Sequence, residues 1–145
     1  MVSAVVLVVV DTNVLVASLI TRDPGSPTAR TLDAMLSGSF LFLLSPALLA
    51  EYRAVLIRPR LMDLHGLTEA DIDEVLAAIT VNALWREPQL DEDGYRAPDE
   101  GDAHLWALLA SEPNAILITG DRLLLENPYP GRQLWPPAKF WLKHP

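Results

Sequence analysis

Residues 5–13 read Val-Val-Leu-Val-Val-Val-Asp-Thr-Asn, and this stretch decides the fold. An apolar run that no polar residue interrupts is typical of a strand buried on both faces of a parallel sheet. Such sheets bind ligands just beyond the carboxyl ends of their strands, so Asp11 is a candidate binding residue. The alternative is that Asp11 or Thr12 only caps a helix that begins at Val14. The stretch by itself favours neither interpretation.

Apolar runs of the same kind recur along the chain and alternate with helical patterns. Further strands are expected at 40–44, near 84–86, at 115–119 and at 133–135, and helices at 14–20, 27–37, 46–58, 69–79 and from 99 to about 111, with a short turn at 123–124 and a last helix from 137. Residues 61–66 are expected to be a connector, and residues 88–98, which include Asp91, Glu92 and Asp93, a solvated loop. The alternation predicts an α/β fold with a mostly parallel sheet.

The composition bounds the class of protein. A chain of 145 residues, half of them hydrophobic, suits a single domain over residues 1–145. The chain has no cysteine, which excludes disulfides, thiolate metal ligands and cysteine nucleophiles and agrees with a reducing cytoplasm. The first apolar run is too short to span a bilayer and lacks a basic leader. We therefore expect a soluble cytoplasmic protein with no membrane segment.

The formal net charge of -8 bears on the partner. Proteins that bind nucleic acid usually present a basic surface, so this charge argues against such a partner unless one of two conditions holds. Either the chain has a local basic patch, or its acidic residues gather to hold cations. Lys139 and Lys143 are the only lysines, so any basic patch depends on arginine.

Carboxylates follow strand ends or lie in first helical turns at four places. Asp11 follows the first strand, Asp121 follows the 115–119 strand, Glu51 lies one turn into the helix after Pro46, and Asp99 and Asp102 flank a helix start. In a parallel sheet these places share one edge. Like charges gathered there would need a cation, and ligands that are all oxygen favour Mg²⁺ or Mn²⁺.

Such a site suits the hydrolysis of a phosphodiester, which needs no cysteine or serine nucleophile. Each acid also has a purely structural interpretation. Asp99 and Asp102 are acids that a helix dipole favours in a first turn, and Asp121 suits a turn. Glu51 suits an exposed ion pair with Arg53 or Arg58. Only the coincidence of all four places at one sheet edge favours a site.

These residues resemble the PIN-domain family, in particular the toxin components of bacterial toxin–antitoxin pairs (VapC-like proteins). The likeness covers nearly the whole chain, in order, through the motifs Val9-Val10-Asp11-Thr12-Asn13, Leu44-Ser45-Pro46 with Glu51-Tyr52, Asp99-x-x-Asp102-x-x-Leu105, and Ile118-Thr119-Gly120-Asp121. The segment from Glu51 through Arg58-Pro59-Arg60-Leu61 also resembles that subgroup. Two other families that place Asp after a first strand fit less well. Haloacid-dehalogenase-like phosphatases need a second Asp where this chain has Asn13, and receiver domains need paired acids and a late Lys.

The resemblance implies a divalent-metal-dependent ribonuclease with a three-layer α/β/α fold and a central sheet of about five strands. Carried over by position, the acidic quartet consists of Asp11, Glu51, Asp102 and Asp121. Asp99 is a possible extra ligand, and the choice between Asp99 and Asp102 stays open because Glu100-Gly101 separates them; Asp102 is preferred because the helix follows it at the usual spacing. Residues that would orient carboxylates or water are Thr12, Asn13 and Thr119.

The resemblance also implies partners. Family members usually dimerise, and the toxins are neutralised by a small antitoxin whose tail occupies the acidic site. The substrate would be single-stranded or structured RNA, and candidate phosphate contacts are Arg22, Arg53, Arg58, Arg60 and Arg122. For His104, a surface position or packing in its helix is expected rather than metal binding. The alternative function is a catalytically weak PIN-like module that binds RNA or a protein without cleaving.

Overall fold

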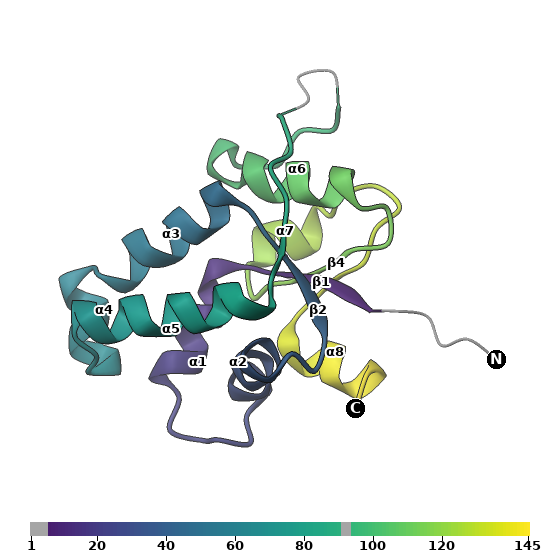
Figure 1. Cartoon of the computed structure of the whole chain (residues 1–145). Helices are drawn as coiled ribbons and strands as arrows, with labels where there is room; N and C mark the ends of the chain where they lie inside the picture. Colours follow the sequence, from purple (N-terminus) through teal and green to yellow (C-terminus); the bar gives the residue numbers. More distant parts are fainter. Residues whose placement is uncertain (1–5, 91–93) are drawn as a thin grey trace.

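The computed structural model describes residues 6–90 and 94–145, and the strands in these ranges form one parallel sheet (Figure 1). The five strands lie in the order β3-β2-β1-β4-β5, and each neighbouring pair is parallel. Their bounds are β1 Leu7–Val10, β2 Leu41–Leu44, β3 Leu84–Trp85, β4 Ile116–Ile118 and β5 Leu134–Trp135. The prediction of a mostly parallel sheet of about five strands is therefore confirmed. Val5 and residues 91–93 of the expected polar loop lie outside the described residues.

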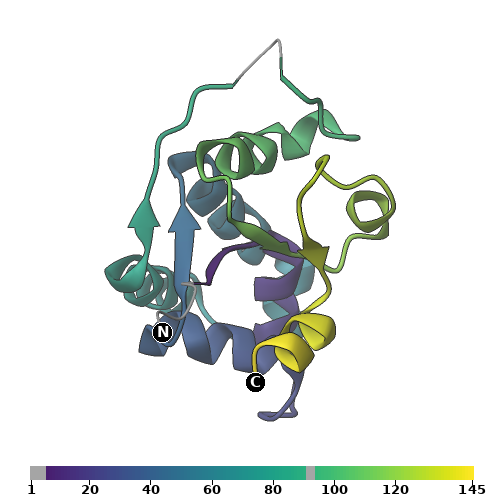
Figure 2. The ribbon, with the colours of Figure 1, turned by 90° about the vertical axis from the view of Figure 1, so that its right-hand side faces the viewer.

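Helices cover both faces of the sheet and complete the three-layer α/β/α arrangement (Figures 1 and 2). Figure 2 shows α6 on one side of the sheet and α2 with α8 on the other. The bounds are α1 Thr12–Ile20, α2 Pro27–Ser37, α3 Pro46–Leu56, α4 Pro59–His65, α5 Glu69–Asn82, the 3-10 turn η1 Glu100–Asp102, α6 Ala103–Ser111, α7 Arg122–Glu126 and α8 Pro137–Lys143. Among the described residues, no helix is long and apolar enough to cross a membrane.

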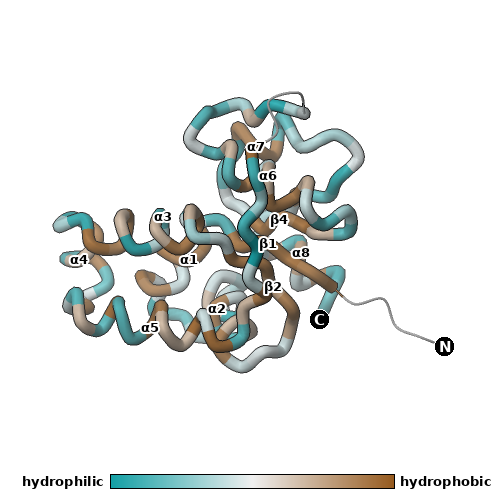
Figure 3. Tube along the Cα trace, turned by 45° about the horizontal axis from the view of Figure 1, so that its top comes forward, coloured by the Kyte–Doolittle hydropathy of each residue, from teal (hydrophilic) through white to brown (hydrophobic). Residues whose placement is uncertain are grey.

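The three central strands form the middle of the core. Every residue of β4 is buried, as are the last three residues of β1 and of β2. Figure 3 shows these strands as a hydrophobic centre below more polar loops. Because burial of a large aliphatic side chain contributes about 1.5–3 kcal/mol, this centre fixes the strand ends firmly. The unbroken apolar run before Asp11 thus has the two-sided burial that its pattern predicted.

Helix ends follow the local sequence signals, with one exception. Ser26 and Ser45 cap α2 and α3, with proline at the first helical position. The prediction of a connector at 61–66 was wrong, because residues 61–65 belong to α4 and Gly66 is its C-cap. Pro59 begins α4, and Gly66, with a φ of 71°, ends it in the left-handed conformation that glycine adopts without strain.

Tyr52 ties α3 to the end of β1. Its side chain is fully buried, and its hydroxyl donates a hydrogen bond to the carbonyl of Val10. This bond fixes the helix that carries Glu51 beside the strand that carries Asp11. The backbone continues the strand pairing past Val10, since the amide of Asp11 donates to the carbonyl of Ile118 at 2.9 Å. The positions of the first, second and fourth strand ends are therefore coupled.

Tyr52→Phe should destabilise the fold because it removes the only side-chain donor that the described residues offer to the Val10 carbonyl. We expect a loss of about 1–2 kcal/mol in the free energy of unfolding, measured by urea denaturation. Tyr95→Phe is the matched control, since Tyr95 is 59% exposed, and should change stability by less than about 0.5 kcal/mol. Equal effects of the two variants would contradict this role of Tyr52.

Candidate functional site

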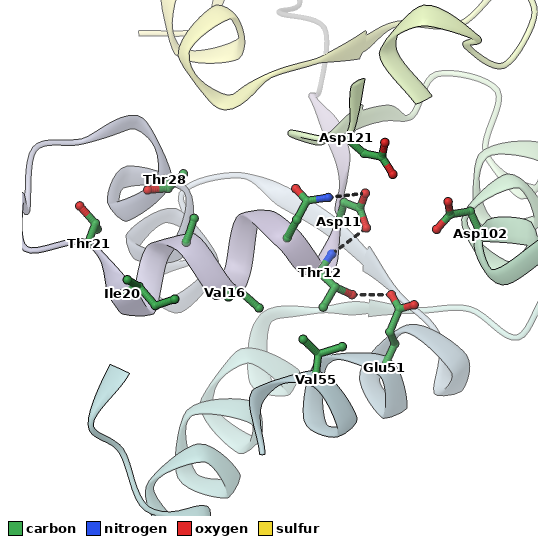
Figure 4. Close-up of a pocket in the computed structure, with 12 residues that line it drawn as sticks. Asp11, Thr12, Val16, Ile20, Thr21, Thr28, Glu51, Val55, Asp102 and Asp121 are labelled. Carbon is green, nitrogen blue, oxygen red and sulfur yellow. Dashed lines mark hydrogen bonds between the residues drawn. The ribbon is translucent and has the colours of Figure 1, made fainter. Parts of the chain in front are cut away.

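A cavity of about 650 Å³ opens at the carboxyl edge of the sheet (Figure 4). The polar residues that line one end of it are Asp11, Thr12, Asn13, Glu51, Asp102 and Asp121, and Thr21 and Thr28 line the other end. The four acids come from four places in the chain: the end of β1, helix α3, the start of α6 and the loop after β4. Among the described residues that line the cavity, none is basic. The fold thus brings together the acidic quartet that the sequence suggested.

Asp11 is buried, with 4% of its surface exposed, and is held by hydrogen bonds to both carboxylate oxygens. Oδ1 accepts from the amide of Thr12 at 2.8 Å, and Oδ2 accepts from the Thr119 hydroxyl at 2.7 Å and the Asn13 side-chain amide at 2.9 Å. Burial raises the pKa of Asp11, and the charge of Glu51 adds to this effect, while the hydrogen bonds oppose it. Asp11 therefore both caps α1 and faces the cavity.

Asn13 and Thr119 connect Asp11 to the loop that carries Asp121. Asn13 Oδ1 accepts from the amide of Gly120 at 2.8 Å, and Thr119 Oγ1 accepts from the amide of Asp121 at 3.0 Å. A Cβ atom at position 120 would lie 3.3 Å from Asn13 Oδ1, so glycine gives this contact its room. The loop after β4 is consequently fixed relative to the end of β1.

Glu51 is held by Thr12 and approached by His104. The Thr12 hydroxyl donates to Glu51 Oε2, and His104 Nε2 lies 3.6 Å from Glu51 Oε1. Neither ring nitrogen of His104 has a hydrogen-bond partner among the described residues, although its side chain is only 16% exposed. We expected His104 to lie at the surface or to pack in its helix; it lies half-buried in α6, with Nε2 toward the acidic cluster. Its position two residues after Asp102, in the first turn of α6, was the available signal.

Among the four carboxylates, Asp102 has a clearly raised pKa. Burial raises its pKa to about 6, helped by the negative charges of Asp11, Asp121, Asp99 and Glu51. Asp99 itself does not line the cavity. It is exposed and caps the 3-10 turn, where Oδ1 accepts from the amide of Gly101 at 2.9 Å. Of these two candidates, the geometry favours Asp102.

Asp121 both caps a helix and lines the cavity. Its Oδ1 accepts from the amide of Leu123 at 2.9 Å and thereby caps α7. The carboxylate also lines the cavity, opposite Asp102 in Figure 4. Asp121 therefore has the structural position that one interpretation predicted and also lines the cavity, as Asp11 does.

The donor chemistry of the cavity suits a hard divalent cation. All candidate ligands are carboxylate oxygens, and burial, with a smaller contribution from neighbouring negative charges, raises the pKa values of Asp11 and Asp102. In the ranges 6–90 and 94–145, however, no group of three or more His, Asp or Glu side chains is already arranged to hold a metal ion. Binding would thus require small side-chain rotations or bridging waters, which Mg²⁺ commonly retains.

The arginines expected on a phosphate path lie outside the cavity. Arg53 pairs with Glu69 and Asp73, at 2.6 Å and 2.8 Å. Arg122 pairs with Glu126 at 3.2 Å and its side chain is 89% exposed. The remaining three, Arg22, Arg58 and Arg60, are exposed. The structure therefore gives no support to Arg53 as a phosphate contact and leaves the others as surface candidates.

Comparison with known proteins gives one match. A family model described as PIN domain matches residues 7–123, most of the chain. The matched range begins at β1 and ends in α7, so it includes all four carboxylates of the cavity. No curated protein matches this chain.

Asp102→Asn should stabilise the metal-free protein at neutral pH. A carboxyl group whose pKa is about 6 in the folded protein and 3.8 ordinarily destabilises the fold when it is ionised. After allowance for solvent screening at this half-buried site, we expect a gain of about 1 kcal/mol at pH 7.5, or roughly 3 °C in Tm. The gain should fade as the pH drops from 6 to 4, because the wild-type group is then protonated.

The measurement is thermal unfolding with a chelator present, from pH 4 to pH 8. Asp33→Asn is the control, because Asp33 is exposed on α2 away from the cavity. A gain for Asp102→Asn that is the same at pH 4 and pH 7.5 would contradict the charge-repulsion explanation.

Proposed function

This chain belongs to the PIN-domain family, and on that premise we propose that it is a divalent-metal-dependent endoribonuclease. PIN domains are generally nucleases. The observation that carries the proposal is the gathering of four carboxylates from four parts of the chain around one cavity whose described lining has no basic residue. The raised pKa values of Asp11 and Asp102 mean that their ionised forms destabilise the fold. A bound cation would stabilise those ionised forms, so the arrangement favours a cation site.

We propose Asp11, Glu51, Asp102 and Asp121 as the groups that hold Mg²⁺ or Mn²⁺, with Asp99 at most an outer contributor. A divalent ion there would supply Lewis acidity toward a phosphodiester and toward an attacking water. The chain supplies orientation, because Thr12, Asn13 and Thr119 fix the carboxylates of Asp11 and Glu51 by hydrogen bonds. Having no cysteine, the chain fits hydrolysis by water rather than by a thiol nucleophile.

The negative net charge of the protein opposes the binding of RNA. A net charge of -8 repels a polyanion, and the arginines lie outside the cavity. Bound cations would therefore have to offset the carboxylates before a phosphate could approach. Affinity for RNA should accordingly depend on divalent ions more than on a basic surface.

We further propose that the protein acts as the toxin of a type II toxin–antitoxin pair, forms a homodimer and is restrained in the cytoplasm by a cognate antitoxin. The motif order and spacing that resemble VapC-like proteins support this role. So does the acidic cavity, because a basic side chain from a partner would be attracted to the place that a cation would otherwise take.

Asp11→Asn should abolish RNA cleavage while the domain stays folded. The substitution keeps the size of the side chain and removes the charge that a cation needs. We expect cleavage of an RNA pool by the purified protein with Mg²⁺ or Mn²⁺, none with chelator, and a decrease of at least about 100-fold, or ~2.7 kcal/mol, in the variant. Circular dichroism and thermal unfolding report the fold, and Asp33→Asn is the control expected to retain activity.

Two outcomes would contradict the nuclease proposal. One is full activity of Asp11→Asn, which would indicate a contaminating nuclease or a different site. The other is a folded wild-type protein that cleaves no RNA with either ion. In that case the alternative, a PIN-like module that binds RNA or a protein without cleaving, would apply, and the lack of a ready-made three-ligand group in the described residues would be its explanation.

Expression of the wild-type protein should arrest bacterial growth if it is a toxin. Asp11→Asn should not arrest growth, because the arrest would depend on cleavage. Co-expression of the protein encoded by the neighbouring gene should relieve the arrest. Growth curves are measured for the wild-type protein, for Asp11→Asn and for the wild-type protein with the co-expressed partner. Harmless expression of a protein that cleaves RNA in vitro would argue against the toxin role and leave the nuclease proposal intact.

A further inference from the structure

The cavity has a second half that the acidic residues do not explain. Away from the carboxylates its lining is aliphatic: Val16, Ala17 and Ile20 from α1, and Val55 from α3. We call these four residues the apolar strip. Figure 4 shows the labelled side chains of Val16 and Ile20 leading away from the carboxylates along α1, with Val55 across from them.

The apolar strip is continuous with the acidic half because both use one face of α1. Thr12, Val16 and Ile20 are spaced four residues apart, so they lie on the same side of the helix. At about 1.5 Å per residue, the distance along the helix from Thr12 to Ile20 is roughly 12 Å. A molecule whose reacting group lies over the carboxylates has the strip as its neighbouring surface.

The chemistry of the strip selects what can lie on it. None of the described lining residues in this half is charged, so it offers nothing to a phosphate. Aliphatic side chains favour a neutral, flat, largely apolar group. At the far end, Thr21 and Thr28 line the same cavity, and hydroxyls can donate to or accept from the edge of such a group.

We propose that the apolar strip is a subsite for one unpaired nucleobase of the RNA, the base adjacent to the cleaved phosphate. The proposal rests on the ribonuclease function above and adds to it a contact surface for one base. A base inside a duplex is stacked and paired, and it must be turned out of the helix to reach such a surface. The protein should therefore cleave single-stranded or looped RNA and leave duplex RNA intact.

The test is a double-mutant cycle between the strip and the base. A short unstructured RNA with one cleaved bond is compared with copies that lack the base on either side of that bond. Loss of one of these bases should lower kcat/KM of the wild-type protein about 5- to 20-fold. Ile20→Ala should lower kcat/KM for the intact RNA by a similar factor. In the Ile20→Ala variant, loss of the base should lower kcat/KM by less than about 2-fold.

Two further variants separate contact from folding. Val55→Thr keeps the shape of the side chain and makes the strip more polar, so it should show the same coupling if Ile20→Ala folds poorly. Leu36→Ala is the control: Leu36 is 39% exposed on α2 and does not line the cavity. It should respond to loss of the base as the wild-type protein does.

Failure of the subsite and failure of the nuclease proposal give different results. In one outcome, RNA is cleaved, and Ile20→Ala and the missing base each lower kcat/KM by the same factor alone as together with the other change. Such independent effects overturn the subsite proposal. If no RNA is cleaved, the same cycle is run on the Kd for RNA, measured by fluorescence anisotropy with Mg²⁺. Coupling between Ile20→Ala and the missing base in Kd would support the base subsite in a protein that binds RNA without cleaving it. Independent effects in both measurements would overturn it and leave a protein segment as the occupant of the strip.

Discussion

Hydrogen bonds hold the buried Asp11 carboxylate at the end of β1, and the rest of the site depends on them. Thr12, Asn13 and Thr119 donate to its two oxygens, while burial and the charge of Glu51 raise its pKa. A buried carboxylate is costly unless it is paired or hydrogen-bonded. These bonds offset that cost only in part, since the pKa of Asp11 stays raised; in the function that we propose, a cation would offset the rest.

The hydrophobic centre allows this arrangement. The strands β1, β2 and β4 are almost wholly buried, and Tyr52 fixes α3 against the end of β1. The strand ends therefore stay in place although the carboxylates around them repel one another, most visibly at Asp102. The same α1 face that starts at the acidic residues continues as the apolar strip. One helix thus connects the acidic residues with the apolar strip that we propose as a base subsite.

Much of the fold followed from local signals in the sequence. Serine caps with proline at the next position marked α2 and α3, and the apolar runs marked the strands of the sheet. The segment 61–66 was taken for a connector because α3 was expected to end near Arg58-Pro59, whereas α3 ends at Leu56 and Pro59 is the first residue of α4. The approach of His104 to Glu51 was not predicted, because the two residues are distant in the chain. No local pattern reports a contact of that kind.

The sequence by itself determined which residues are available for chemistry: oxygen ligands without cysteine, placed after buried strands or in first helical turns, in an order that resembles the PIN-domain family. Only the tertiary structure decided how they are used. It put Asp102 in the cavity and left Asp99 outside as a cap, engaged Arg53 with Glu69 and Asp73, and joined Val55 to the α1 face. The physical reason is that strand order and helix packing, which no short stretch of sequence contains, set distances between residues far apart in the chain.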